Sequence, residues 1–272
     1  FAAAFKAHPY GHPVIGWLED IRQLGREDLA RHYRTHYVPN NAVVVAVGAF
    51  DREALFARIR ETFGRIPRGP DVPPVRSVEP PQEGERRVFV KREAKLPFVF
   101  AGYHTPAFAH ADAFALEVLA SVLADGKSSR LHRSLVYEQQ MALYAGAYYD
   151  RVSADPSLLY VYAAALPGKG GDAVEKALYA EVERLQREPV GERELEKAKN
   201  QLEADFLLSQ DSIFSLARQI ATYEMVASWR DWERYVPGVR AVTAADVQRV
   251  ARTYLTPDNR TVGILVPQPA KE

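Results

Sequence analysis

Hydrophobic and polar positions follow two different periods along this 272-residue chain. Apolar residues at spacings of three and four indicate amphipathic helices, and strict alternation indicates half-covered strands. Helices are predicted at 26–36, 51–64, 112–126, 128–140, 171–187, 191–226 and 243–255. Strands are predicted at 42–50, 86–93, 97–105, 143–150, 157–166 and 260–267. This order predicts an α+β fold of antiparallel-sheet-plus-helix layers.

Two of these elements carry additional predictions. The segment "AVVVAVGAF" at 42–50 is almost entirely apolar and β-branched, which predicts a strand covered on both faces. The polar triplet "QDS" at 210–212 interrupts the long helix at 191–226. It either kinks this helix or is buried and hydrogen-bonded within it.

A proline-rich stretch divides the chain. Residues 66–84 contain six prolines and are predicted to form an extended, semi-rigid linker. We therefore divide the sequence into residues 1–70, a linker at 71–84, and a second domain at 85–272.

An internal repeat relates the two parts. "DLARHYRTHYVPNN" starts at Asp28 and "DVQRVARTYLTPDN" starts at Asp246, and each is a predicted helix, a turn and an apolar strand. The identical pairs are Asp28 with Asp246, Arg31 with Arg249, Arg34 with Arg252, Thr35 with Thr253, Pro39 with Pro257 and Asn41 with Asn259. The second copy ends a unit that begins near residue 85. An equivalent first unit would lie mostly before Phe1, so we expect the tail of one domain followed by a complete homologous one.

Composition narrows the function classes only slightly. The 35 basic and 35 acidic residues cancel, so no basic field suggests a nucleic-acid partner. The chain has no cysteine, and no apolar run approaches the ~20 residues of a membrane span. We expect no membrane span, and periplasmic and cytoplasmic locations both remain open.

The histidines raise the question of a metal site. His8 and His12 lie in "HPYGHPVIGW", where two prolines and a glycine prevent a regular helix from presenting both rings on one face. A structural loop is favoured over a metal site. His32 and His36 have helical i, i+4 spacing but no intervening acid of the H-E-x-x-H type, so packing is favoured over metal binding there. We expect no metal ligand and no stoichiometric zinc in this chain.

Tyrosines gather on two predicted neighbouring strands, at positions 144, 148, 149, 160 and 162. Aromatic edge strands suit the addition of an extended peptide to a sheet. Packing within an amphipathic sheet explains the same pattern equally well.

The segments "HPYGHPVIGW", "YVPNNAVVVAVGAFD" and "ETFGRIP" closely resemble the insulinase/pitrilysin family of zinc peptidases. The second half continues the resemblance in "GKSSRLHRSLVYEQQMALYAGAYYD", "EPVGERELEKAKNQLEADF" and "TAADVQRVARTYLTPDN". The family's paired homologous domains match the internal repeat. The resemblance therefore implies the C-terminal part of a first peptidase-family domain, followed by a complete second, non-zinc domain.

The resemblance also implies a function. In the family, an inverted H-x-x-E-H motif and a later Glu hold zinc in the first domain, before the equivalent of "HPYG". The full-length parent is expected to be a zinc metalloendopeptidase acting on peptides or unfolded segments. This chain would form its chamber wall and substrate-binding surface, with no catalytic residue and no activity alone. The alternative is a non-catalytic scaffold or partner subunit of the same family.

Two residues are assigned to the substrate by this resemblance. The family's second domain often supplies an Arg and, seven residues later, a Tyr that contact substrate near the zinc. Tyr144 matches the second position, whereas Tyr137 stands at the first in place of Arg. This departure implies the zinc-bearing kind of chain, working with a related partner subunit or as a homodimer on a peptide substrate.

Overall fold

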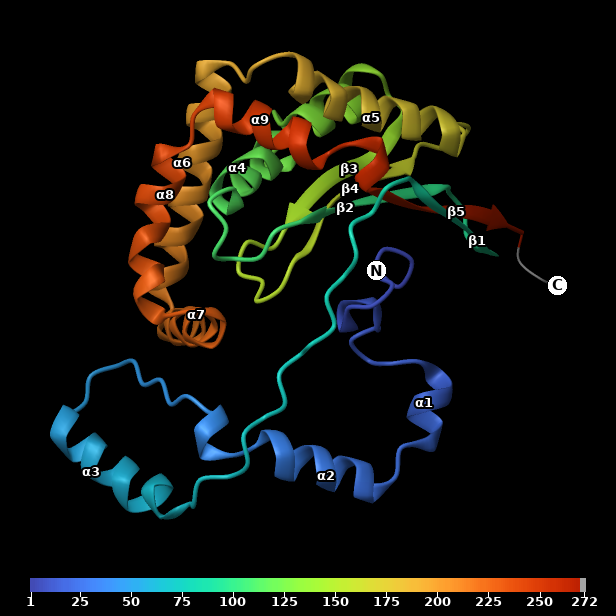
Figure 1. Cartoon of the computed structure of the whole chain (residues 1–272). Coiled ribbons are helices and arrows are strands. Elements are labelled where there is room, and N and C mark those ends of the chain that lie inside the picture. The colour runs from blue at the N-terminus through green and yellow to red at the C-terminus, as the bar shows by residue number, and fades with distance from the viewer. Residues whose placement is uncertain (270–272) are drawn as a thin grey trace.

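A five-stranded sheet forms the centre of the second unit, which we define as residues 85–269 (Figure 1). The computed structural model describes residues 1–269. The strands are β1 (Arg86–Glu93), β2 (Phe98–Thr105), β3 (Ala142–Tyr149), β4 (Ser157–Ala165) and β5 (Arg260–Gln268). Their order is β1-β5-β2-β4-β3; β1 and β5 are parallel, and the other neighbours are antiparallel. The predicted α+β fold is confirmed.

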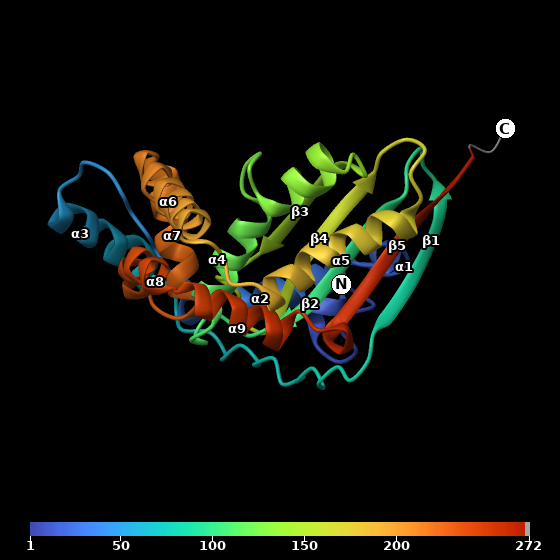
Figure 2. The same cartoon turned by 90° about the horizontal axis from the view of Figure 1, so that it is seen from above.

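Helices cover one face of this sheet, while the other face is left largely open (Figures 1 and 2). The helices that lie on the sheet are α4 (Ala113–Ala124), α5 (Gly171–Arg187) and α9 (Ala244–Tyr254), while α6 (Glu192–Leu208) and α8 (Tyr235–Ala241) pack against α4 beside the sheet. The inward side chains of β2 and β4, such as Val99 and Val161, are buried against this layer with Leu116 and Leu178. Alternation along the strands thus separates a packed face from an open one.

Polar contacts attach α9 to the start of α4. The Asp112 carboxylate lies 2.7 Å from the Arg249 guanidinium and accepts a 2.7 Å hydrogen bond from the Tyr254 hydroxyl. Burial alone would raise the pKa of Asp112, but these hydrogen bonds outweigh it and hold the pKa below its usual value. Asp112 is therefore charged and paired at neutral pH.

Two predicted helices differ in the structure. Residues 128–140 contain a π-helix, η4 (His132–Glu138), whose start is not capped by either Ser128 or Ser129. The predicted helix 191–226 is divided into α6 and α7 (Ile213–Val226) by a 3-10 turn, η5 (Ser209–Asp211). The break has a local cause, because the Ser212 hydroxyl accepts a 3.3 Å bond from the Ser215 amide and starts a new helix.

The first unit, which we define as residues 1–70, contains helices only. They are α1 (Leu18–Gln23), α2 (Arg26–His36) and α3 (Arg52–Thr62), with short 3-10 turns η1 (Pro9–Gly11), η2 (Pro39–Asn41) and η3 (Phe63–Arg65). The predicted strand at 42–50 does not form: the segment pairs with no other strand of residues 1–269, and Val43 and Val44 are about half exposed. A strand needs a neighbour to satisfy its backbone groups, and none is present beside this segment.

The internal repeat reproduces the same local hydrogen bonds at a constant spacing of 218 residues. The Asn41 and Asn259 side chains donate to the carbonyl five residues earlier, at 2.9 and 2.7 Å. The Thr35 and Thr253 hydroxyls each donate to the carbonyl four residues earlier, at 2.9 and 3.0 Å. Asn259 additionally donates to the His104 carbonyl of β2 at 2.9 Å, which joins its turn to the sheet. No such bond to a sheet is present for Asn41 within the described residues.

The two copies differ sharply in burial. Leu29 and Tyr37 are 62% and 69% exposed, whereas the matched Val247 and Leu255 are 0% and 2% exposed. The same contrast holds across α1 and α2. We call their uncovered residues the unpaired apolar face: Trp17, Ile21, Leu24, Leu29, Tyr33 and Tyr37. In the second unit the positions matched to these six all belong to the core.

The proline-rich linker is extended and attached at both ends. The Asn40 side chain accepts a 2.9 Å bond from the Gly69 amide, just before the linker, and donates a 3.5 Å bond to Asp71; the Gln82 side chain donates to the Arg260 carbonyl at 2.7 Å. The linker is therefore an extended segment whose two ends are held in place by hydrogen bonds. Among the described residues, no helix has the length and apolar character to cross a membrane.

Candidate functional site

The open face of the sheet carries a cluster of aromatic side chains from three strands. The register pairs Phe100 with Tyr162 and Tyr148 with Tyr160, so these rings point to the same side. We call this cluster the aromatic face: Phe98, Phe100, Tyr144, Tyr148, Tyr160 and Tyr162. The sequence singled out these four tyrosines but also included Tyr149, which is 8% exposed and packs in the core, and it missed the two phenylalanines, although "PFVFAGYHT" alternates in the same way.

The rings of the aromatic face contact one another. The centroids of Phe100 and Tyr160 are 4.6 Å apart, those of Tyr148 and Tyr160 are 5.3 Å apart, and those of Tyr144 and Tyr162 are 6.4 Å apart. These separations lie within the range of favourable aromatic pairs. Burial raises the pKa of both Tyr148 and Tyr160; Asp150 adds to the rise at Tyr148, and Tyr148, Tyr162 and then Asp150 add to it at Tyr160. Their hydroxyls are therefore neutral hydrogen-bond donors at physiological pH.

The two residues assigned to substrate lie in different settings. Tyr144 is on β3, is 49% exposed and belongs to the aromatic face. Tyr137 is on η4, is 77% exposed and makes no aromatic contact within residues 1–269. β3 is the last strand of the sheet, so its outer edge has no strand partner in the described part of the chain. Tyr144 thus combines an exposed ring with a free strand edge.

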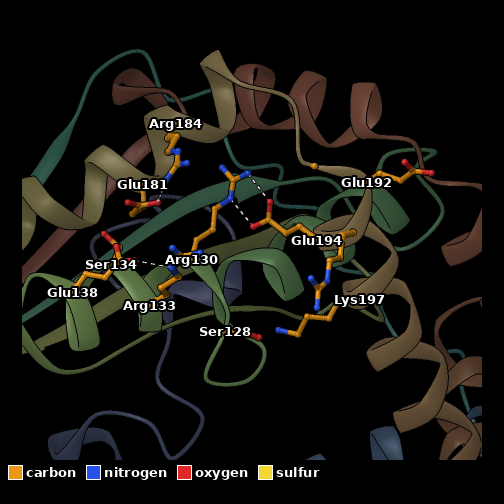
Figure 3. Close-up of a pocket in the computed structure, with 12 residues that line it drawn as sticks. Ser128, Arg130, Arg133, Ser134, Glu138, Glu181, Arg184, Glu192, Glu194 and Lys197 are labelled. Atoms are coloured by element: carbon orange, nitrogen blue, oxygen red, sulfur yellow. Dashed lines mark hydrogen bonds and ion pairs between the residues drawn. The ribbon is translucent and has the colours of Figure 1, made fainter.

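A separate polar pocket of about 720 Å³ lies between η4 and the neighbouring ends of α5 and α6 (Figure 3). Arg130 makes two 2.8 Å hydrogen bonds to the Glu194 carboxylate, and Arg133 makes a 2.7 Å bond to Glu138. The first pair attaches the residues just before η4 to α6, and the second lies within η4. Their main effect is structural, because opposite charges on the wall largely neutralise one another.

His8 is buried in the "HPYG" loop. Its Nδ1 accepts a 3.2 Å bond from the Tyr10 amide, and its Nε2 faces the Asp155 carboxylate at 3.5 Å. The ring is only 7% exposed, so it serves the loop and its contact with the turn between β3 and β4. His12 ends η1 through its amide, which donates to Pro9. These contacts fit a structural loop better than a ligand pair.

His32 and His36 lie with their ring centroids 4.4 Å apart on α2. Their matched positions in the second unit are Val250 and Tyr254, and Val250 is completely buried in the core. The histidines therefore occupy positions whose counterparts in the second unit lie in or against the core. Within residues 1–269, no group of three or more His, Asp or Glu side chains could hold a metal ion. The residues present do not fit a catalytic zinc.

Comparison with known proteins identifies relatives of this chain. Residues 23–202, more than half of the chain, match the family model described as "Peptidase M16 inactive domain". The chain is 28% identical to "Zinc protease PqqE" of Helicobacter pylori over 98% of its own length and 61% of that protein. It is 25% identical to "Probable mitochondrial-processing peptidase subunit beta, mitochondrial" of Arabidopsis thaliana, covering 93% of this chain and 49% of that protein.

A solved structure gives the same result. The crystal structure of a protease from Helicobacter pylori superposes with a TM-score of 0.92 at 29% identity, covering 97% of this chain and 64% of that chain. The present chain thus spans less than two thirds of each of these three relatives. Both fold and sequence agree with the resemblance to insulinase/pitrilysin peptidases. The chain belongs to the peptidase M16 inactive-domain family.

Proposed function

We propose that this chain is the C-terminal portion of a zinc metalloendopeptidase. In this proposal residues 1–70 end a first domain, residues 71–84 link the domains, and residues 85–272 form a complete second domain without zinc. The zinc ligands belong to the part of the protease that precedes "HPYG". The relatives named as zinc proteases support the expectation of zinc in the longer protein.

The observation that carries this proposal is the unpaired apolar face. Helices α1 and α2 repeat the arrangement of α8 and α9, but only the second copy is covered by a sheet and its helices. Burying a leucine-sized side chain contributes about 1.5–3 kcal/mol to stability. Covering these six exposed apolar side chains would therefore strongly stabilise the first unit. A sheet layered like β2 and β4 is the occupant that fits.

A second feature supports the same occupant. The extended segment 42–50 lies at the position of β5 in the repeat, and beside it is an apolar groove of about 580 Å³. Its walls include Val43, Val44 and Phe56 on one side and Ile220 and Trp229 on the other. A sheet pairing with 42–50 would give this segment the hydrogen bonds that it lacks and would bring α7 against the sheet.

The second domain supplies a wall for the peptide substrate. The free edge of β3 can accept an extended peptide as an added strand, with Tyr144 and the aromatic face beside it. Tyr137, exposed on η4, lies at the end of the chain segment that leads into β3. The absence of Arg at position 137 favours a protease that shares its site with a related subunit, and one relative is named as a subunit of a peptidase.

Metal analysis and peptidase assays of two protein lengths test the proposal. The 272-residue chain should hold no stoichiometric zinc and should not cleave an unfolded peptide. A longer form that includes the preceding domain should hold about one zinc per chain and lose activity with a chelator. Chelator-sensitive cleavage by the 272-residue chain itself would contradict the proposal. A longer form that binds neither zinc nor peptide would favour the alternative, a non-catalytic scaffold subunit.

The substrate surface has its own test in this chain. Tyr144→Ala should weaken binding of a fluorescein-labelled unfolded peptide roughly fivefold, the equivalent of about 1 kcal/mol for a lost aromatic contact. Phe89→Ala is the matched control, because Phe89 is 58% exposed on β1 at the opposite edge of the sheet. Equal losses in both variants, measured by fluorescence anisotropy, would exclude β3 as the peptide-binding edge.

A further inference from the structure

The carboxylate of Glu79, in the proline-rich linker, is bound by three consecutive backbone amides of the first unit. The Lys6 amide lies 2.8 and 2.9 Å from its two oxygens. The amides of Ala7 and His8 donate to Oε2 at 2.8 and 3.0 Å. The Glu79 side chain is only 9% exposed. Residues 73 positions apart are thus joined through one buried carboxylate.

The basic side chains around this carboxylate are Arg86, which is charged, and His104, whose pKa is lowered by burial. Arg86 of β1 places Nη1 3.9 Å from Glu79 and also donates to the Ala4 carbonyl. His104 of β2 faces the same carbonyl, with Nε2 3.0 Å from it. Burial alone would raise the pKa of Glu79, but the three backbone hydrogen bonds outweigh it and lower the pKa. Glu79 is therefore ionised at neutral pH.

We infer that the amides of residues 6–8 form a carboxylate-binding site and that Glu79 is its internal ligand. Successive backbone N–H groups that converge on one point form an anion-binding concavity, and hydrogen bonds to an ionised acceptor are stronger than neutral ones.

The hydrogen bonds between Glu79 and the amides of residues 6–8 hold the linker against the first unit, and we call this contact the lock. Figure 1 shows the linker passing beside the N-terminal segment on its way to β1. The same segment reaches the aromatic face, where the Phe1 and Tyr160 rings are 6.3 Å apart and Phe5 packs with Leu158. Glu79 thus fixes how the first unit lies against the end of the aromatic face. Loss of the carboxylate should release residues 6–8 while the core of the second unit stays folded.

Hydrogen exchange of the full chain tests the lock. Exchange of the Lys6, Ala7 and His8 amides should be at least about tenfold faster in Glu79→Ala and increase less in Glu79→Gln, which keeps an acceptor without the charge. The control Glu83→Gln makes the same change at an exposed linker position and should leave these amides unchanged. The buried amide of Val99 reports in each variant that the sheet is intact.

Chemical rescue then distinguishes an anion-binding site from a purely structural contact of the linker. Acetate added to Glu79→Ala should restore protection at residues 6–8, and chloride at the same ionic strength should not. Failure of acetate to restore protection would show that the amides do not form a site without the linker. Unchanged exchange in Glu79→Ala, or equal effects of Glu79→Gln and Glu83→Gln, would overturn the lock.

Discussion

Replacing Arg151 should strongly destabilise the second unit. The side chain is 3% exposed, and its Nε lies 3.0 Å from Oε2 of Glu117. The guanidinium carbon also lies 4.6 Å from the centroid of the Phe114 ring and 5.1 Å from that of Tyr235. Arg151 therefore connects α4, the turn after β3 and α8 through one buried cation. Arg151→Met keeps most of the side-chain volume but removes the charge.

The expected loss follows from the partner that remains. Glu117, whose side chain is 18% exposed, would keep one hydrogen bond from the Tyr235 hydroxyl at 3.0 Å but no cation. Removing one partner of a buried ion pair costs about 3–5 kcal/mol. With a urea m-value of about 2 kcal/mol/M, the unfolding midpoint should fall by roughly 1.5–2.5 M. The midpoint is measured by circular dichroism during urea titration.

A second substitution and a pH series test the reasoning. Glu117→Gln combined with Arg151→Met should recover much of the loss, because no uncompensated charge remains. Burial raises the pKa of Glu117, and attraction to Arg151 opposes that rise. Without Arg151 the folded-state pKa rises further, so the folded protein binds a proton more tightly than the unfolded chain. The deficit of Arg151→Met should therefore shrink as the pH is lowered from about 8 to 5. A loss below about 1 kcal/mol that does not vary with pH would refute the argument.

Three further predictions concern the repeat, the carboxylate before α4 and the packing of α8. Asn259→Ala should lower the free energy of unfolding in urea by about 1–3 kcal/mol, because two carbonyls lose their donor. The matched Asn41→Ala should lower it by under about 0.5 kcal/mol. Equal losses would contradict the difference in burial. Because its folded-state pKa is depressed, Asp112 contributes stability at neutral pH that is lost as the pH falls through that pKa. The melting temperature of Asp112→Asn should thus differ from that of the wild type at pH 7 and converge with it in acid. A difference in melting temperature that stays constant with pH would be inconsistent with this linkage. A Cβ on Gly238 would lie 2.4 Å from the Phe114 ring, so Gly238→Ala should cost about 1–3 kcal/mol, and an unchanged melting temperature would show that the ring moves freely.

Sequence patterns correctly predicted the elements whose backbone hydrogen-bonding partners lie within the described residues. The five strands of the second unit and helices α2, α4, α5 and α9 lie within a few residues of their predicted ranges. The segment 42–50 has a stronger strand pattern than β1 but forms no strand. A strand forms only when it pairs with another strand, and the local propensity of a segment does not show whether such a partner is present. The sequence located the interruption at 210–212, next to η5, but "QDS" could not show whether the helix kinks there or holds buried, hydrogen-bonded polar residues; the structure instead starts a new helix after Ser212.

The candidate site shows the same division between local and non-local information. Alternation placed Tyr144 on a strand and correctly grouped it with the tyrosines of β4. The order of strands in the sheet, which leaves β3 at the edge, depends on which strands pair across long stretches of sequence. The contact between Glu79 and the amides of residues 6–8 was equally inaccessible, because backbone donors leave no mark in a sequence.

The internal repeat explains which positions stay identical when two units diverge. Asp28 and Asp246 each accept a 3.0 Å bond from the amide three residues earlier, and Asn41 and Asn259 each bond a helix-end carbonyl. These bonds require a particular atom at a particular place, so no other residue type replaces them easily. The apolar positions differ between copies, as Leu29 and Val247 do, because a core needs matching volume more than identity. The repeat therefore preserves the caps and turns that start and end its helices, while the apolar positions between them differ.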